Sequence, residues 1–247
     1  MTHAFPVPAV SDAIRSQLAP KGHLRAGINL SNTLLVSGRT KEGAPEGVSP
    51  DMARAVAAAL GVPCQLVPYP TPGEVADAIA RDEWDIGLIG AEPQRAAIIA
   101  FSPAYAEIEA CYCVRADSNL TNHSDIDQPG RRIATTARAA FTLWLERNIH
   151  QATLIPAESL DAARDCFLRG EAHVLASLRT KIEDAKMPGT RLIEPAFMTV
   201  QQAIGCAKAH IEAANWLAAL VRSACESGFV AARIQHHGVR GLQAARP

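Results

Sequence analysis

The feature that most constrains the fold is an alternation of short apolar runs with amphipathic stretches in the first part of the chain. The runs "LRAGI" (24–28), "CQLV" (64–67) and "WDIGLIG" (84–90) have the length of strands. Two stretches with helical spacing of apolar residues lie between them, at about 49–61 and about 73–82. Strands that alternate with helices predict β-α-β units and a mostly parallel sheet. We therefore expect an α/β lobe here.

The first of these helices has clear boundary signals. Ser49 is expected as its N-cap, Pro50 at its first position and Gly61 as its stop. Apolar residues repeat every four positions along it: Met52, Val56 and Leu60. In the second helix, Val75 and Ile79 are expected to point inward.

A second block repeats this pattern from about residue 130. It reads as strand "RRIATT" (131–136), a helix at about 139–149, strand "TLI" (153–155), helix "SLDAARDCFLRG" (159–170) and strand "HVLASL" (173–178). Two similar blocks predict two α/β lobes with a cleft. The strands "CYCVRADSN" (111–119) and "TVQQAIGCAKAH" (199–210) are expected to connect them.

These connections predict that residues 1–114 and 206–247 form lobe 1 and that residues 115–205 form lobe 2. A helix at about 211–227 and a short helix near 229–237 should pack back on lobe 1. The longer helix is expected to bury one side: Ile211, Leu217, Val221 and Cys225.

Charge and hydropathy exclude several classes of partner. The 24 basic and 25 acidic residues are spread without a basic run, which argues against nucleic acid. No run approaches the roughly 20 apolar residues of a membrane span. The N-terminal residues lack the pattern of a secretory signal, so the chain is expected to be cytoplasmic as written, and periplasmic if an export signal is missing.

Cysteines, histidines and common motifs give no sign of a metal or a cofactor. The six cysteines are expected to be small buried hydrophobes, and strand alternation places Cys111 and Cys113 on one face with Tyr112 on the other. His236 and His237 are expected at a solvated helix end. The dinucleotide, phosphate-loop, serine-hydrolase and zinc-protease motifs do not occur.

One arginine stands out in "GAEPQRAAIIAFSPAY" (90–105). If Pro93 starts a helix after the buried strand, Arg95 lies at a helix N-terminus, where the dipole disfavours a cation unless an anion meets it. It would also lie at the carboxyl edge of the sheet, where open α/β folds bind ligands. The alternative is a surface arginine paired with Glu92 or another nearby carboxylate.

These segments resemble, in order, the motifs of the family 3 extracellular solute-binding proteins, the amino-acid receptors of bacterial ABC importers. "GVSPDMARAVAAALGV" is similar to the family's "G-F-D-x-D-L-A-x-A-I-A-x-x-L-G-V", and "PQRAAIIAFSPAY" to its "P-E-R-x-x-x-x-x-F-S-x-P-Y". The resemblance covers about residues 22–238. It implies a two-lobed periplasmic-binding-protein type II fold, with Arg95 gripping a ligand carboxylate. Glu92, Asn32 and Ser31 match cleft positions of the first lobe.

The chain departs from the family at the other end of the ligand. Asn32 and Leu35 stand where the family has a stacking ring, and residues 138–140 stand where it has "G-T-T". The family's acid that receives the ligand's amino group aligns close to Leu178 in this comparison. A carboxylate ligand without an obligatory ammonium is therefore expected.

Four residues of the second lobe could replace the lost closing contacts: Thr135, Thr136, Arg138 and Phe141. Glu109 is also expected among the ligand-binding residues. Arg138 could add a second anion contact, which would favour a dicarboxylate. The alternative is a solvent-facing arginine at a helix start.

The expected function is capture of a small carboxylate in the interlobe cleft by hinge closure, without chemistry, metal or cofactor. An ABC permease is the partner that the resemblance implies, and a monomer or weak dimer is expected. One alternative is a lyase like the cyclohexadienyl dehydratases of the same fold, with Glu92, Glu107 and Glu109 as candidate acids, one of the last two buried with a raised pKa. A cytoplasmic carrier or sensor is another. A regulator's effector domain is disfavoured because no helix-turn-helix segment is found.

Overall fold

The computed structural model describes residues 5–246, and these fall into two compact units. Unit 2 is Ile108–Val200, and unit 1 is formed by the chain on both sides of it. The expected boundaries, after residue 114 and before residue 206, lie in the same two strands, β6 (Ile99–Arg115) and β10 (Thr190–Ala207). Strand β6 crosses the observed boundary at residue 108, and β10 crosses the one at residue 200, without a break in either strand. The predicted class of two α/β lobes is confirmed.

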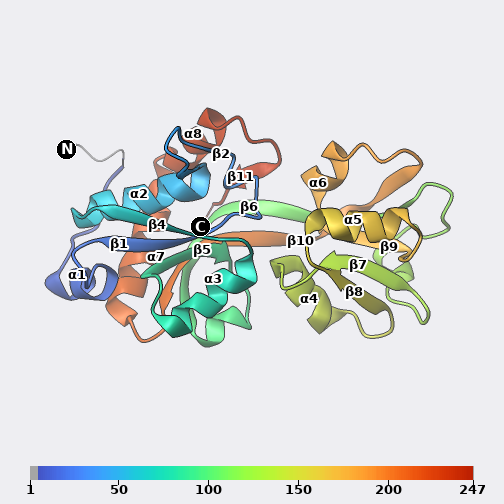
Figure 1. The fold of residues 1–247 in the computed structure, drawn as a ribbon, viewed down its shortest axis with the longest axis horizontal. Coiled ribbons are helices and arrows are strands. Elements are labelled where there is room, and N and C mark those ends of the chain that lie inside the picture. Colours follow the sequence, from blue (N-terminus) through green and yellow to red (C-terminus); the bar gives the residue numbers. More distant parts are fainter. Residues whose placement is uncertain (1–4, 247) are drawn as a thin grey trace. The chain divides into compact units, whose positions relative to one another are not determined.

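The sheet of unit 1 has the strand order β4-β1-β5-β10-β6, with β11 paired to β6 (Figure 1). Its other strands are β1 (Leu24–Asn29), β4 (Cys64–Tyr69), β5 (Ile86–Gly90) and β11 (Leu242–Ala244). A small hairpin, β2 (Gly38–Arg39) and β3 (Pro45–Glu46), stands apart from it. Strands β4, β1 and β5 are parallel, and β10 is antiparallel to β5. The carboxyl ends of β1 and β5 therefore lie at the same edge.

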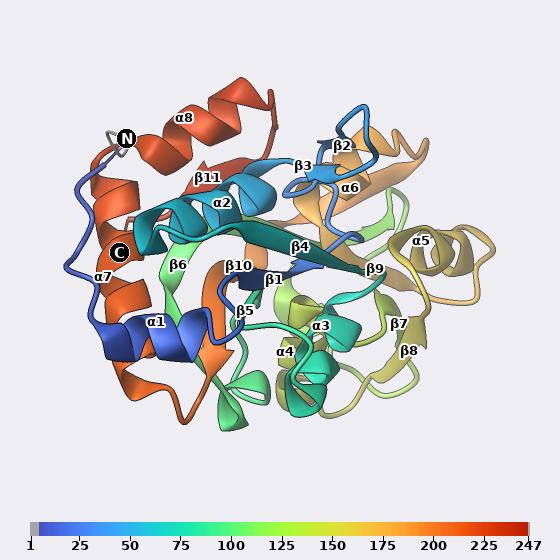
Figure 2. The same ribbon diagram turned by 60° about the vertical axis from the view of Figure 1, so that its left-hand side comes forward.

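Helices cover this sheet. They are α1 (Asp12–Leu18), α2 (Val48–Leu60), α3 (Pro72–Ala78), α7 (Ile211–Glu226) and α8 (Phe229–His236), with two 3-10 helices, η1 (Ile79–Arg81) and η2 (Arg95–Ala97). Helices α2 and α3 pack on β1, β4 and β5, while α1 packs against α7 and α8 against α2 (Figure 2). The C-terminal helices thus pack on unit 1, as predicted. Within residues 5–246, no helix is long and apolar enough to span a membrane.

Two glycines make room for a tryptophan on one face of this sheet. Gly27 in β1 and Gly87 in β5 are register partners. A Cβ atom at Gly27 would lie 2.9 Å from Cδ1 of Trp84, and one at Gly87 would lie 3.0 Å from its Cζ2. The Trp84 indole is 3% exposed, and its N–H donates to the carbonyl of Val75 at 2.8 Å. Close packing of helix α3 on the sheet therefore depends on these glycines.

A buried ion pair ties β1 to the start of β5. Asp85 accepts a hydrogen bond from the backbone N–H of Arg25 at 2.7 Å and one from its guanidinium Nη2 at 2.7 Å. Arg25 is 7% exposed and Asp85 6%. The guanidinium also reaches Asp82, whose side chain is 77% exposed, and this bond lowers the pKa of Asp82. Arg25 therefore lies at the amino ends of the strands, at the edge of the sheet opposite their carboxyl ends.

Unit 2 has the strand order β6-β9-β7-β8, with helices on both faces (Figure 1). Its elements are β7 (Arg132–Thr136), β8 (Thr153–Ala157), β9 (Val174–Leu178), α4 (Ala140–Asn148), α5 (Leu160–Leu168), α6 (Arg179–Asp184) and the 3-10 helix η3 (His123–Asp125). Cys111 and Cys113 lie in the core beneath α5, and Tyr112 lies in the core beneath α4. The predicted alternation of these three side chains is confirmed.

The start of helix α2 differs from the prediction. Its N-cap is Gly47, at φ 144°, where a Cβ atom would lie 2.2 Å from the carbonyl oxygen of Leu35. Only glycine tolerates that backbone position. Ser49 lies inside the helix, and its hydroxyl is 2.7 Å from that of Tyr105. The stop at Gly61, with φ 72°, is as predicted.

Most other expectations about helices are confirmed. The second helix is α3 followed directly by η1, and Ile79 packs partly buried against the core. In α7, Leu217 and Val221 are buried as predicted, but the expectation for Ile211 is wrong, because its side chain is 67% exposed.

The two histidines at the end of α8 differ. His236 is exposed, as predicted. The His237 side chain is only 14% exposed, and its Nε2 lies 2.9 Å from Oδ2 of Asp51, which ties α8 to α2.

Candidate functional site

The segment after β5 carries Arg95 into a tight turn. The expected α-helix does not form, because η2 is a single 3-10 turn of three residues and β6 begins at Ile99. Strand β6 is held next to β10, where the hydroxyl of Ser102 accepts the N–H of Ile204 at 3.1 Å. A three-residue turn has no useful dipole, so the helix-terminus argument for an anion at Arg95 fails.

Arg95 is nevertheless a buried cation. Its side chain is 5% exposed, and Nη1 donates to the carbonyl oxygen of Gly90 at 2.6 Å. Glu92 is 3% exposed, and both side chains take part in further polar interactions. Arg95 is therefore not at the surface, which contradicts that part of the alternative. The bond to Gly90 orients the guanidinium at the carboxyl end of β5.

Ser31 and Asn32 follow the carboxyl end of the neighbouring strand, β1. Asn32 is 8% exposed; its Oδ1 accepts the N–H of Leu34 at 3.2 Å. Ser31 is exposed, and its hydroxyl donates to Oδ1 of Asn29 at 2.8 Å. Because β1 and β5 are adjacent and parallel, these residues share one edge of unit 1 with Glu92 and Arg95. This is the edge at which open α/β sheets bind ligands.

Unit 2 presents polar residues at the corresponding edge of its own sheet. Thr136 ends β7, and Leu178 ends the neighbouring parallel strand β9. Oγ1 of Thr136 is buried and has no hydrogen-bond partner within residues 5–246. Arg138 is exposed and has φ 58°, an uncommon conformation for an arginine. Leu178 is 6% exposed and brings no charge to this edge.

Two of the expected closing residues lie inside unit 2. Thr135 is fully buried, and its hydroxyl is 2.6 Å from that of Thr142. Thr142 donates its own proton to the carbonyl of Thr136 at 2.6 Å, so Thr135 is the donor of the pair. Phe141 is 3% exposed. The two threonine hydroxyls thus link helix α4 to the end of β7.

A charged cluster that the sequence did not indicate follows β9. Arg179 donates from Nη1 and Nη2 to the two carboxylate oxygens of Glu194, at 2.7 Å each, and from Nε to Glu109. These bonds lower the pKa of Glu194 and raise that of Arg179. The Glu109 side chain is 44% exposed, so the expected buried acid is not found there. The only sequence signal for Arg179 was its place directly after a buried strand.

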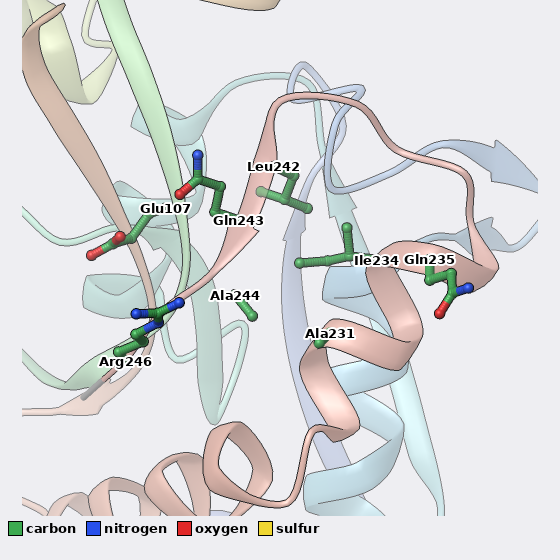
Figure 3. A pocket seen from close by; sticks show the side chains of 8 residues that line it. All are labelled: Glu107, Ala231, Ile234, Gln235, Leu242, Gln243, Ala244 and Arg246. Atoms are coloured by element: carbon green, nitrogen blue, oxygen red, sulfur yellow. The ribbon is translucent and has the colours of Figure 1, made fainter.

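Glu107 lies in a different place, within unit 1. It lines an open cavity of about 720 Å³ together with residues of α8, β11 and the segment after β11 (Figure 3). Arg95 and Glu92 are not among the lining residues. Glu107 is half-buried rather than buried. The candidate acid and the candidate carboxylate anchor are therefore not brought together.

No metal site is found in the part of the chain that the structure describes. Among residues 5–246, no group of three or more His, Cys, Asp or Glu side chains is placed to hold an ion. Burial raises the pKa of the Cys111 thiol to about 12 and that of Cys206 to about 12. Such thiols are inert at neutral pH.

Several solved structures of binding proteins have a similar fold. A mutant of ArgBP from T. maritima aligns with a TM-score of 0.72 at 18% identity, over 92% of this chain and 100% of that one. The putative binding component of an ABC transporter from Wolinella succinogenes, complexed with lysine, aligns with a TM-score of 0.72 at 18% identity, over 87% and 95%. The ancestral amino acid-binding protein AncCDT-1, a precursor of cyclohexadienyl dehydratase, gives 0.71 at 18% identity, over 91% and 99%.

A search of curated protein sequences finds no match. The family model of the bacterial extracellular solute-binding proteins, family 3, matches residues 25–235, which contain both units except for the ends of unit 1. The match includes most of β1 and most of α8. With the two-unit α/β fold and the polar edge at Arg95, it shows that the chain belongs to the bacterial extracellular solute-binding proteins, family 3.

Proposed function

We propose that this solute-binding protein captures a small ligand through a carboxylate group and that Arg95 holds this carboxylate. The observation that carries the proposal is a guanidinium that is 5% exposed and oriented by Gly90 at the carboxyl edge of β5. A planar guanidinium binds a carboxylate with two parallel hydrogen bonds. A charge removed from water attracts an anion more strongly than a surface charge does.

The ligand of this proposal needs no ammonium group. Leu178 at the end of β9 has no charge to offer, and the nearby carboxylates of Glu109 and Glu194 are already bonded to Arg179. An ammonium placed there would lose its water without gaining a free partner. A simple organic acid fits this chemistry.

An amino acid is the second candidate ligand. The similar structure from Wolinella succinogenes is complexed with lysine, and other similar structures are amino-acid-binding proteins. In this chain the buried Glu92 would then receive the amino group. The lyase alternative has less support, because Glu107 lines a cavity without Arg95 and Glu109 is bonded to Arg179.

The proposal includes a transport role. Several similar structures belong to ABC transporters, and the family name describes extracellular proteins. The partner would be an ABC permease, and the place of action would be outside the cytoplasmic membrane. Co-purification with a permease expressed in the same cells would test this part.

Native mass spectrometry tests the ligand proposal. The wild-type chain is expected to retain a small acid, and Arg95→Ala to lose it, because a charge-assisted bidentate contact is worth about 1.5–3 kcal/mol, or roughly 10- to 150-fold in affinity. Arg39→Ala, on the exposed hairpin of unit 1, is the matched control and should retain the acid. Equal retention by all three proteins would remove Arg95 from the site. Identification of the retained mass separates an organic acid from an amino acid.

A further inference from the structure

Unit 2 contains a cavity that the solute-binding proposal does not use. It is lined by residues of α5, β9, α6 and the segment after α6, and its volume is about 220 Å³. We call it the unit 2 cavity. All of its lining residues lie within 160–187, and neither Thr136 nor Arg138 is among them. It is therefore separate from the polar edge at the end of β7.

A buried hydroxyl group lines this cavity. Ser177 of β9 is 3% exposed, and it lies on the same face of the strand as Leu175, which belongs to the core beneath α5. The Ser177 hydroxyl makes no hydrogen bond within residues 5–246. A hydroxyl that is removed from bulk water without a partner costs free energy. A ligand that supplies the missing partner would recover this cost.

The walls around Ser177 are apolar. Leu175, Ile182 and Met187 are each more than nine-tenths buried, and Leu160 of α5 lines the cavity beside them. The flexible thioether of methionine makes favourable contacts with aromatic rings. Since an apolar cavity of about 150 Å³ holds benzene, about 220 Å³ has room for one ring that carries a small substituent.

The exposed end of the cavity carries no net charge. Two basic side chains, Arg164 and Lys181, and two acidic ones, Asp161 and Asp184, line it there. Nη1 of Arg164 donates to Asp161 at 2.7 Å, and Lys181 and Asp184 also take part in polar interactions. Because the four charges sum to zero, they favour neither an anion nor a cation. A charged ligand would also lose its water on entering the apolar walls.

We propose that the unit 2 cavity binds a small neutral phenol. The aromatic ring packs on Leu175, Ile182 and Met187, and the phenolic hydroxyl forms the missing hydrogen bond with Ser177. A hydroxyl can donate and accept, so this bond requires no change of protonation on either side. The proposal concerns a site other than Arg95 and does not rest on the proposed function.

NMR titration of the full ¹⁵N-labelled chain with phenol tests the proposal. At millimolar phenol, saturable amide shifts are expected in α5, α6 and β9. Ser177→Ala should weaken phenol binding roughly fivefold, which is the effect of one neutral hydrogen bond. The same variant should bind toluene as the wild type does, because toluene has a methyl group in place of the hydroxyl. An equal loss for both ligands, or no loss for phenol, would overturn the assignment of Ser177.

Further variants test the place of binding. Ala185→Phe puts a ring into the wall of the cavity and should weaken phenol binding at least about tenfold, while Ala232→Phe, on the exposed side of α8, should not. Ser177→Ala removes an unpaired hydroxyl, so urea unfolding should show it to be at least as stable as the wild type. Arg95→Ala should leave phenol binding unchanged. Shifts confined to unit 1, or no shifts at all, would overturn the proposal.

Discussion

Replacing Asp85 by alanine should unfold unit 1 at a much lower urea concentration. The Asp85 carboxylate receives the backbone N–H of Arg25 at 2.7 Å, the guanidinium Nη2 at 2.7 Å and Nε at 3.2 Å. Both residues are more than nine-tenths buried. Without Asp85, the buried guanidinium retains only its contacts with Asp82, and the backbone N–H at the start of β1 loses its partner.

The expected loss follows from the cost of an uncompensated buried charge. Removing one partner of a buried ion pair costs about 3–5 kcal/mol. The whole stability of a folded domain is about 5–15 kcal/mol. With a urea dependence of about 2 kcal/mol per molar, the unfolding midpoint should fall by roughly 1.5–2.5 M.

Urea unfolding followed by circular dichroism measures this shift, and Asp82→Ala is the matched control. Asp82 binds the same guanidinium, but its side chain is 77% exposed, so its loss is compensated by water and should move the midpoint far less. If the two variants move the midpoint equally, burial does not determine the strength of this ion pair and the reasoning is refuted.

Two further predictions concern packing and pH. Gly87→Ala should lower the free energy of unfolding by about 1–3 kcal/mol, because its Cβ would lie 3.0 Å from Cζ2 of Trp84. In the control Gly38→Ala, the Cβ would lie 3.8 Å from its nearest atom, so thermal melts should show almost no change. In unit 2, partial burial by itself raises the pKa of Asp127, but hydrogen bonds from the N–H groups of residues 150–152 lower it overall. Asp127→Ala should therefore destabilise unit 2 at neutral pH. The difference in free energy of unfolding between wild type and variant should have its full size above the ordinary pKa of 3.8. It should vanish as pH falls through the lowered pKa that Asp127 has in the folded protein. A difference that does not change with pH would contradict this reasoning.

Local sequence signals were enough to predict most of the framework. The helix that ends at Gly61 and the buried strand before Gly90 carry strong signals, because glycine stops and continuous apolar runs depend only on nearby residues. The repeat of the pattern after residue 130 predicted unit 2. Alternation alone predicted that Cys111 and Tyr112 enter different cores.

Features that depend on distant residues could not be predicted in this way. The segment after Pro93 has helix-like signals, but pairing of β6 with a strand about a hundred residues later leaves it only one 3-10 turn. Position 47 requires glycine because a Cβ atom there would meet the carbonyl oxygen of Leu35, which the local pattern does not reveal.

The candidate sites also combine features set by nearby residues with features set by distant ones. The carboxyl edge of β5 was predictable from the order of strands and helices, and so was the place of Arg95 along it. The bonds of Arg179 join helix α6 to β6 and β10, and the cavity beside Glu107 joins β6 to residues more than a hundred positions later. The spacing of residues within one segment does not predict contacts between segments so far apart in the sequence.

The insertion of unit 2 into unit 1 fixes an order of maturation during synthesis. Strand β5 needs β10, which leaves the ribosome only after all of unit 2, because Gly87 pairs with Gly205. Unit 2 is one continuous stretch, Ile108–Val200, so it can be completed first although unit 1 is started first. The nascent first half must therefore wait with the β5 edge of its sheet exposed, a period in which edge-to-edge association with other nascent chains is its main hazard.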